Sequence, residues 1–261
     1  MPSWVQIPAP AFFEFSKPIS LNLHFFKTNI IRMLFGKEDF RIVKILILSL
    51  ALGTFLGIIV GLIVPKIFLL FSFFKEEMPI ETMILIFLSN SFLATLICYG
   101  GVLFSLAETK VYPFSFYRFF DKVFDPFYDF LSRFSKKIRK LKPMYRSCYF
   151  SLFYFPLGCI FLFFFLISSF FSIFLNILGF SVFPRLIKLF PHVLLETFCF
   201  SFSAFQALKI KNRLEKYLFE KKLVKFKKEA RKALKDRSIK EKLLVVYTLL
   251  LISAFVEKIG F

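Results

Sequence analysis

The sequence predicts an all-α integral membrane protein, a helical bundle of five transmembrane helices with additional amphipathic interfacial and cytoplasmic helices. Hydrophobic residues make up 57% of the 261 residues, above the roughly 45 to 50% of soluble domains, and the mean hydropathy is +0.70. The apolar residues come in long runs, as membrane helices require. Charged blocks separate these runs and give the chain a net charge of +19.

The N-terminal part, residues 1–44, is interrupted by prolines, and its apolar pieces are too short to span a bilayer. We interpret it as a cytoplasmic tail lying on the membrane surface, with His24 as an interfacial side chain. The membrane domain then covers residues 45–261, and its first predicted span is 45–64. Since the first long apolar run starts only there, we expect no cleaved signal peptide.

Small residues recur at helical spacing in the first two predicted spans. Gly53, Gly57 and Gly61 lie four residues apart in the first span, a pattern typical of close helix packing. The second span, residues 83–106, carries a small and polar stripe at Asn90, Ala94, Cys98, Gly101, Ser105 and Glu108. We expect both stripes to face protein, within one subunit rather than between two, although a homo-oligomer stays open. For Asn90 we favour a hydrogen bond across a helix interface, which contributes roughly 0.6 to 2 kcal/mol.

The connection at residues 107–147 has Phe residues at helical spacing and ends in a basic run. It predicts one or two amphipathic helices in the headgroup region. The run consists of Lys136, Lys137, Arg139, Lys140 and Lys142. Nucleic-acid binding is the alternative interpretation of such a run. We favour contact with membrane lipid, and expect no nucleic acid, because a predicted span follows directly.

The third and fourth predicted spans are residues 148–178 and 192–208. The third exceeds one bilayer crossing, and Pro156 predicts a kink in it. Pro191 suits the first turn of the fourth, where its missing N–H has no intrahelical partner. One face of this helix carries polar and small residues, namely His192, Glu196, Cys199, Ser203 and Gln206. Such a glutamate is costly in lipid, so we expect it to face protein in a functional role. A structural role, hydrogen bonding to a neighbouring span, stays open.

Residues 209–242 contain 15 Lys and Arg against 5 Asp and Glu, which predicts a basic amphipathic cytoplasmic helix or helical hairpin. The fifth span, residues 243–256, follows and ends beside Glu257. Lys and Arg outside the five spans number 6, 2, 10, 2, 15 and 1 in chain order. The positive-inside rule therefore predicts a multi-pass protein of the cell membrane, with a cytoplasmic N-terminus and an extracytoplasmic C-terminus. This topology gives Asn90, His192, Glu196 and Glu257 similar depth in the outer leaflet, where they could converge.

Three short motifs resemble the stage II sporulation protein M family of five-span membrane proteins. Pro191, His192 and Glu196 match its Pro-His-Gly-x-x-Glu pattern, with Val193 in place of the Gly. The segment LISAFVEKIGF is similar to the family's final Ala-rich run, which places Glu257 on its terminal acid. Asn90, followed by Gly100 and Gly101, is similar to the family's second span. The resemblance implies the five-span fold and membership of a membrane assembly, which in spore formers works with peptidoglycan-degrading partners as a membrane scaffold.

Three functions remain as hypotheses. The first is a non-enzymatic scaffold or membrane-remodelling component with a membrane or envelope protein partner. The second is a transporter or channel subunit that uses Glu196 and His192, with the helix N-terminus at Pro191 attracting an anion. The third is an intramembrane enzyme. His24 is the only other histidine and is predicted on the opposite side of the membrane, and the four cysteines lack CxxC spacing. A zinc site needs at least three protein ligands, so His192 and Glu196 would need a further ligand from Glu257 or from another chain. We therefore expect the first function, with no catalytic residues, no metal and no cofactor.

Overall fold

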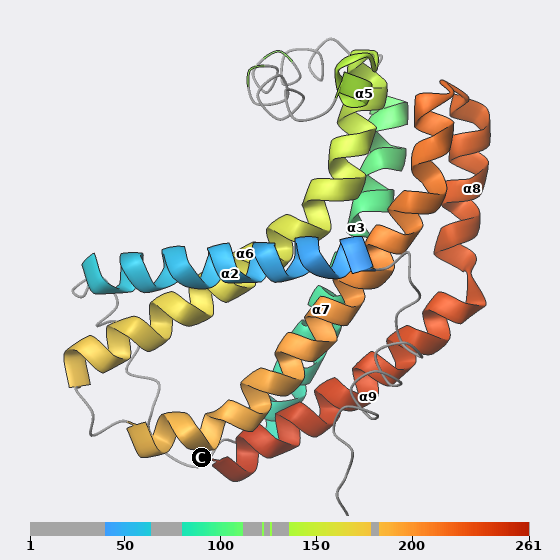
Figure 1. Ribbon diagram of the computed structural model, residues 1–261. Helices are drawn as coiled ribbons and strands as arrows, with labels where there is room; N and C mark the ends of the chain where they lie inside the picture. Colours follow the sequence, from blue (N-terminus) through green and yellow to red (C-terminus); the bar gives the residue numbers. More distant parts are fainter. Residues whose placement is uncertain are drawn as a thin grey trace, which may run out of the picture. The chain divides into compact units, whose positions relative to one another are not determined.

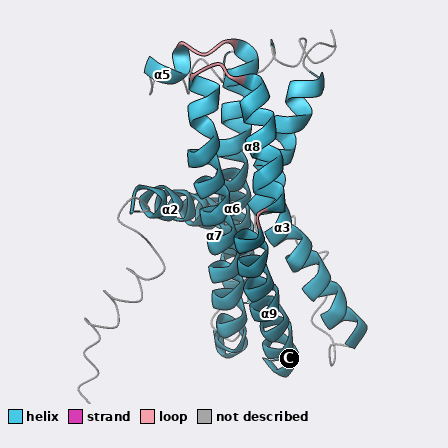
Figure 2. Cartoon of the chain, turned by 90° about the vertical axis from the view of Figure 1, so that its right-hand side faces the viewer, coloured by secondary structure: helices cyan, strands magenta, loops and turns pink. Residues whose placement is uncertain are grey.

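The computed structural model describes residues 40–63, 80–111, 122, 126, 136–178 and 183–260, with side chains except at 63, 111, 136, 137, 174–178, 183–189 and 257–260. The chain divides into two units, residues 1–41 and 42–261, and the architecture given below is that of the second. Every regular element in the described part is a helix (Figures 1 and 2), which confirms the all-α class. The predicted tail lies outside the described residues up to residue 39.

The helices are α2 (Phe40–Ile63), α3 (Ile80–Val111), α5 (Lys136–Arg139), α6 (Pro143–Leu178), α7 (Phe183–Phe219), α8 (Leu223–Lys235) and α9 (Arg237–Gly260). Helices α2, α3, α6 and α7 are long and apolar enough to cross a membrane. They contain the first four predicted spans almost completely, as expected of a multi-pass membrane protein. The fifth predicted span lies within α9 and stays a prediction.

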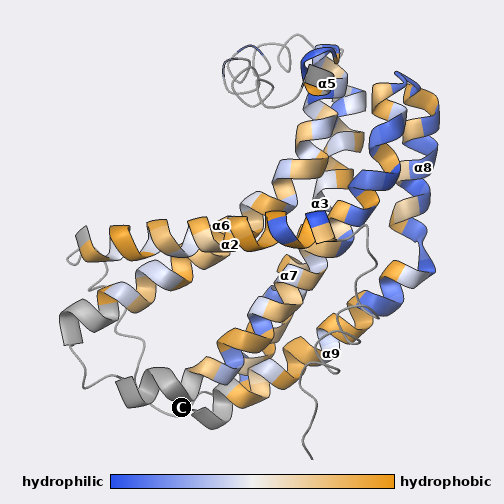
Figure 3. Ribbon diagram, in the orientation of Figure 1, coloured by the Kyte–Doolittle hydropathy of each residue, from blue (hydrophilic) through white to orange (hydrophobic). Residues whose placement is uncertain are grey.

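Helices α3, α6 and α7 are longer than a bilayer is thick. They contain 32, 36 and 37 residues, so at 1.5 Å per residue they extend about 48 to 56 Å, whereas the hydrocarbon core measures about 30 Å. Figure 3 shows that hydrophilic residues gather at α5, α8 and the adjoining end of α7, while α2 is largely apolar. The long helices therefore continue from the apolar region into a basic end.

Helix α7 begins earlier than the sequence predicts. Its first residue is Phe183, and Pro191 lies inside the helix, so the prediction that Pro191 lies in the first turn of this helix is wrong. Pro184 instead occupies the first turn, where a missing N–H costs no intrahelical bond. At Pro191 the helix continues with one backbone hydrogen bond fewer. The backbone N–H groups of His192 and Val193 do not lie at a helix end, which removes the basis for an anion site there.

Helix α2 packs backbone to backbone against α6. All three glycines of its stripe, Gly53, Gly57 and Gly61, face this helix. A Cβ atom added at Gly53 or Gly61 would lie 2.6 Å from the carbonyl oxygen of Phe161 or Ser169, respectively. No side chain fits at such a distance, so the glycines allow the two helices to touch within one chain. Helix α6 contains Pro156 and bends part-way along its length (Figure 1).

The part of the α3 stripe at Gly101 and Ser105 faces α6 as well. A Cβ added at Gly101 would lie 2.6 Å from the carbonyl oxygen of Ser151, whereas one added at Gly100 would meet only the Phe155 ring. One turn further on, the fully buried Ser105 hydroxyl donates a hydrogen bond to a backbone carbonyl of α6 at 2.9 Å. Small residues thus bring α3 and α6 together near the basic end.

The basic end has its own hydrophobic core, formed where α7 and α8 make the predicted hairpin. Its fully buried side chains include Leu214 and Leu218 of α7 with Phe226 and Ala230 of α8. The Tyr145 hydroxyl of α6 donates to a carbonyl in the α7–α8 turn at 3.0 Å. The core fixes α8 to the ends of the long helices, so this region is a packed extension of the bundle.

The predicted interfacial helices at residues 107–147 fall largely outside the described residues. The basic run at their end forms α5 and the turn that follows it. Ile138 and Leu141 pack into the core of the basic end, while Arg139, Lys140 and Lys142 are exposed. The side chains at positions 136 and 137 are not described. Headgroup contact by this run stays a prediction.

Candidate functional site

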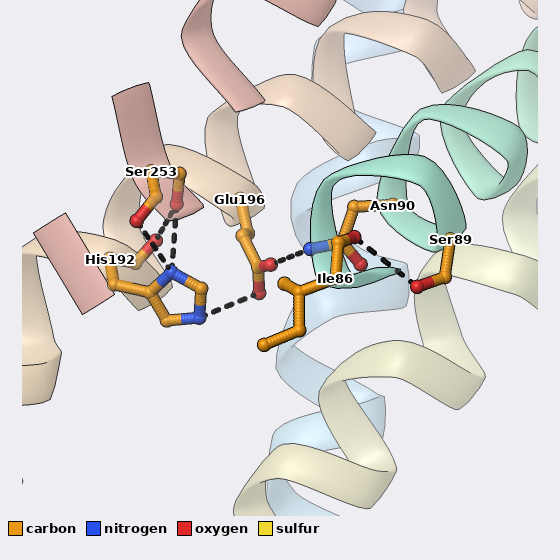
Figure 4. A network of polar contacts seen from close by, with 6 residues as sticks. All are labelled: Ile86, Ser89, Asn90, His192, Glu196 and Ser253. Carbon is orange, nitrogen blue, oxygen red and sulfur yellow. Dashed lines mark hydrogen bonds and ion pairs between the residues drawn. The ribbon is translucent and has the colours of Figure 1, made fainter. Parts of the chain in front are cut away.

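A polar network joins three apolar helices (Figure 4). Asn90 comes from α3, His192 and Glu196 come from successive turns of α7, and Ser253 comes from α9. His192 and Glu196 are only 8% and 7% exposed, and Ser253 is fully buried. Buried polar groups need hydrogen-bond partners, and in this region the partners come from the facing helices.

The amide of Asn90 links α3 to α7. Its Nδ2 atom donates a hydrogen bond to the Glu196 Oε1 atom. A carboxylate oxygen can only accept, so the amide nitrogen must face it. The contact satisfies one of the two oxygens of a carboxyl group that would be costly to leave bare in lipid.

The imidazole of His192 links α7 to α9. Its Nδ1 atom lies 2.8 Å from the Ser253 hydroxyl and 3.3 Å from the Ser253 carbonyl oxygen. With hydrogen on Nδ1, the ring donates to these Ser253 oxygens, and the Ser253 hydroxyl can donate to the His192 carbonyl oxygen, which lies 3.2 Å away. With hydrogen on Nε2, Nδ1 instead accepts a hydrogen bond from the Ser253 hydroxyl. Either tautomer of the ring therefore has a partner on α9.

The imidazole of His192 and the carboxyl group of Glu196 face each other one helical turn apart. The His192 Nε2 and Glu196 Oε2 atoms are 3.5 Å apart. A hydrogen on Nε2 or on the carboxyl group would point into this contact, and an imidazolium would pair with an ionised carboxylate. A buried charge on either group costs less when the other group faces it.

The structure brings together three of the residues that the sequence singled out, Asn90, His192 and Glu196. Gln206 is buried on the same helix but lies ten residues from Glu196, about 15 Å along the axis. Pro191 immediately precedes His192 in α7. The side chain of Glu257 lies outside the described part, so its convergence with the others stays a prediction.

Sequence reasoning missed Ser253. This residue lies one turn before Glu257 in a run of leucine, isoleucine and alanine. It shares a face with Val246 and Leu250, which are also buried. A hydroxyl at helical spacing from the acid on the last predicted span was therefore a usable signal.

No known protein identifies this site, because no family model, no curated protein and no solved structure matches the chain. Among the described residues, no group of three or more His, Cys, Asp and Glu side chains could hold a metal ion. The cysteines Cys98, Cys148 and Cys199 are buried and unlinked. The described geometry offers hydrogen bonding between helices and one buried titratable pair, His192 and Glu196.

An ion pair closes the basic end, where α8 meets α9. Arg213 of α7 donates to Asp236 at 2.9 Å, and the Ser238 N–H donates to the same carboxylate at 3.0 Å. The hydrogen bond from Arg213 holds the pKa of Asp236 below its ordinary range. Asp236 thus caps the first turn of α9 and connects it to α7.

Proposed function

We propose that this chain is a non-enzymatic scaffold or membrane-remodelling component of an envelope complex in the cell membrane. The observation that carries the proposal is the continuity of α3, α6 and α7, which extend from the apolar region into a packed basic end. The polar network fixes α3, α7 and α9 to one another in the apolar region, and α8 packs across their ends. Such a body holds an extramembrane surface at a fixed place relative to the membrane, as a scaffold must.

A fifth span and the orientation of the chain belong to the proposal. Helix α9 lies antiparallel to α7, with Asp236 beside Arg213 near one end and Ser253 beside His192 near the other. Between them, Cys199 donates a weak hydrogen bond to the Val246 carbonyl at 3.7 Å. The pairing supports a fifth span in α9 that lies alongside α7. With the basic end in the cytoplasm, the N-terminus is inside and the C-terminus outside.

The resemblance to the stage II sporulation protein M family supports the same function. The matching residues Asn90, His192 and Glu196 are the ones that tie helices together in this chain. These residues hold the membrane helices in a fixed arrangement. A fixed arrangement suits a scaffold, whose role is to hold other proteins together in a complex. The partner in this proposal is a membrane or envelope protein.

Affinity purification of the tagged chain in mild detergent tests the proposal. Wild type is compared by mass spectrometry with a His192→Ala/Glu196→Gln variant and with Ser89→Ala, whose hydroxyl bonds only to carbonyls of its own helix. We expect a defined envelope partner with wild type and with Ser89→Ala, and its loss from the double variant at normal abundance. A chain that purifies alone in every case contradicts the scaffold function.

The buried pair of His192 and Glu196 supports a second candidate, a proton-linked transporter or channel subunit. His192 and Glu196 form a titratable pair inside the apolar region, and such pairs mark proton pathways in membrane proteins. Proteoliposomes with a pH gradient and an internal pH dye test this function. We expect proton flux that Glu196→Gln abolishes if the chain is a conduit. Equal flux from both proteins would exclude a role for the pair.

A further inference from the structure

Helix α8 presents a basic stripe on the face that points away from the bundle. Its buried residues, Phe226, Ala230 and Ala233, lie on one side of the helix. A shallow hollow on the exposed side is lined by Val224, Lys227, Lys228, Arg231, Lys232 and Lys235. These positions recur at steps of three and four, so they form one continuous line along the helix.

The charge of this stripe is largely uncompensated. Helix α8 contains six basic residues and one acid, Glu229, and Glu229 pairs with Lys232 at 2.9 Å. Among the described residues, no acidic side chain forms an ion pair with Lys228, Arg231 or Lys235, and all three are exposed. The stripe therefore offers three cations at helical spacing to a partner outside the chain.

The packing of α8 argues against a membrane surface as that partner. A helix that lies in the interface inserts its apolar face among the lipid acyl chains. The apolar face of α8 is already covered, with Phe226 and Ala230 fully buried. On the exposed side the hollow contains a single apolar residue, Val224, which is 82% exposed. It contains no aromatic ring on which a nucleic-acid base could stack.

We infer that the stripe of α8 docks an acidic α-helical segment of a partner protein. Lys228, Arg231 and Lys235 follow one another at three and four residues, which is the spacing at which Glu or Asp residues line one face of a helix. A helix lying alongside α8 would meet each cation with one carboxylate, as charged residues flanking a coiled-coil seam do. The inference rests on the proposed scaffold function and names the chemistry of its partner.

Peptide binding to the full-length chain in zwitterionic nanodiscs tests the inference. Two fluorescent helical peptides of equal composition are compared by anisotropy, one with its glutamates on a single face and one with them distributed around the helix. We expect the one-faced peptide to bind more tightly. Lys228→Gln/Arg231→Gln/Lys235→Gln should weaken it about tenfold, since each exposed ion pair contributes modestly. The matched control Arg139→Gln/Lys140→Gln/Lys142→Gln removes the same charge from the end of α5 and the turn after it, and should change affinity less than about threefold.

Several outcomes would overturn the inference. Equal weakening by both triple variants would show diffuse attraction rather than a docking stripe. Equal binding of the two peptides, or displacement of the peptide by oligouridylate or phosphatidylserine vesicles at lower concentration, would assign the stripe to nucleic acid or lipid. A cellular partner held equally by wild type and the α8 variant would also contradict it and leave the scaffold function standing. Absence of any cellular partner would contradict the scaffold function instead.

Discussion

The contact between Asn90 and Glu196 should couple α3 and α7 energetically. We propose a double-mutant cycle of Asn90→Ala, Glu196→Ala and the double variant. Asn90 contributes one amide donor to the carboxyl group, whereas Glu196 also faces the His192 ring. Removing the Glu196 side chain therefore disturbs its contacts to Asn90 and to His192. Removing the Asn90 side chain disturbs the link between α3 and α7.

Measured hydrogen bonds between membrane helices set the expected size of the coupling. They average about 0.6 kcal/mol and reach about 1.7 kcal/mol, because the unfolded state in lipid also finds partners. We expect a coupling energy within this range for the Asn90 and Glu196 pair. Glu196→Ala should cost more than Asn90→Ala, since the His192 ring then loses its partner at Nε2 as well.

Unfolding in mixed micelles of mild detergent and SDS, followed by far-ultraviolet circular dichroism, gives the free energies. Ser89→Ala is the matched control on α3, because its hydroxyl bonds to carbonyls of its own helix at an exposed position. Its effect should stay within about 0.5 kcal/mol. If the two variants of the pair add to within about 0.3 kcal/mol, the residues do not interact and the network is not a link between helices.

Three further predictions follow from the packing and the caps. Gly57→Leu should destabilise the chain by about 1 to 3 kcal/mol in the same SDS titration, because any side chain there meets the α6 backbone. The control is Gly158→Ala, which should be neutral or slightly stabilising because no atom lies within 4 Å of the added Cβ. Phe226→Ala should cost about 3 to 5 kcal/mol and expose the α7–α8 hairpin to trypsin, whereas Val224→Ala should leave the digestion pattern unchanged because Val224 is 82% exposed. Asp236→Ala should cost about 1 kcal/mol at neutral pH through loss of the α9 cap. The pKa of Asp236 is lowered in the folded chain. The stabilisation that its carboxylate contributes is therefore complete above the ordinary pKa of about 3.9 and disappears as pH falls through the lowered pKa. A difference in unfolding free energy between wild type and Asp236→Ala that persists at the lowest pH would contradict this.

Local properties of the sequence determined the class of the protein and most of its spans. Runs of apolar residues predicted the helices α2, α3, α6 and α7, because spanning a bilayer requires only length and hydrophobicity. The glycine stripe at Gly53, Gly57 and Gly61 indicated a tightly packed face, since a missing Cβ is a property of the residue itself. Reasoning from local properties also put Pro191 at a helix start, which was wrong. Packing against neighbouring helices lets α7 continue past Pro191 although one backbone hydrogen bond is lost.

Only the tertiary structure decided which polar faces meet. Hydropathy and charge counting give the depth of a residue in the bilayer, whereas contacts also depend on the rotation and tilt of each helix, which side-chain packing sets. Asn90 therefore meets Glu196 because α3 and α7 turn these faces toward each other. Ser253, whose spacing of four residues from Glu257 is its one sequence signal, meets His192 because α9 lies antiparallel to α7. That contact depends on how the two helices are arranged and on nothing local to the His192 and Glu196 motif.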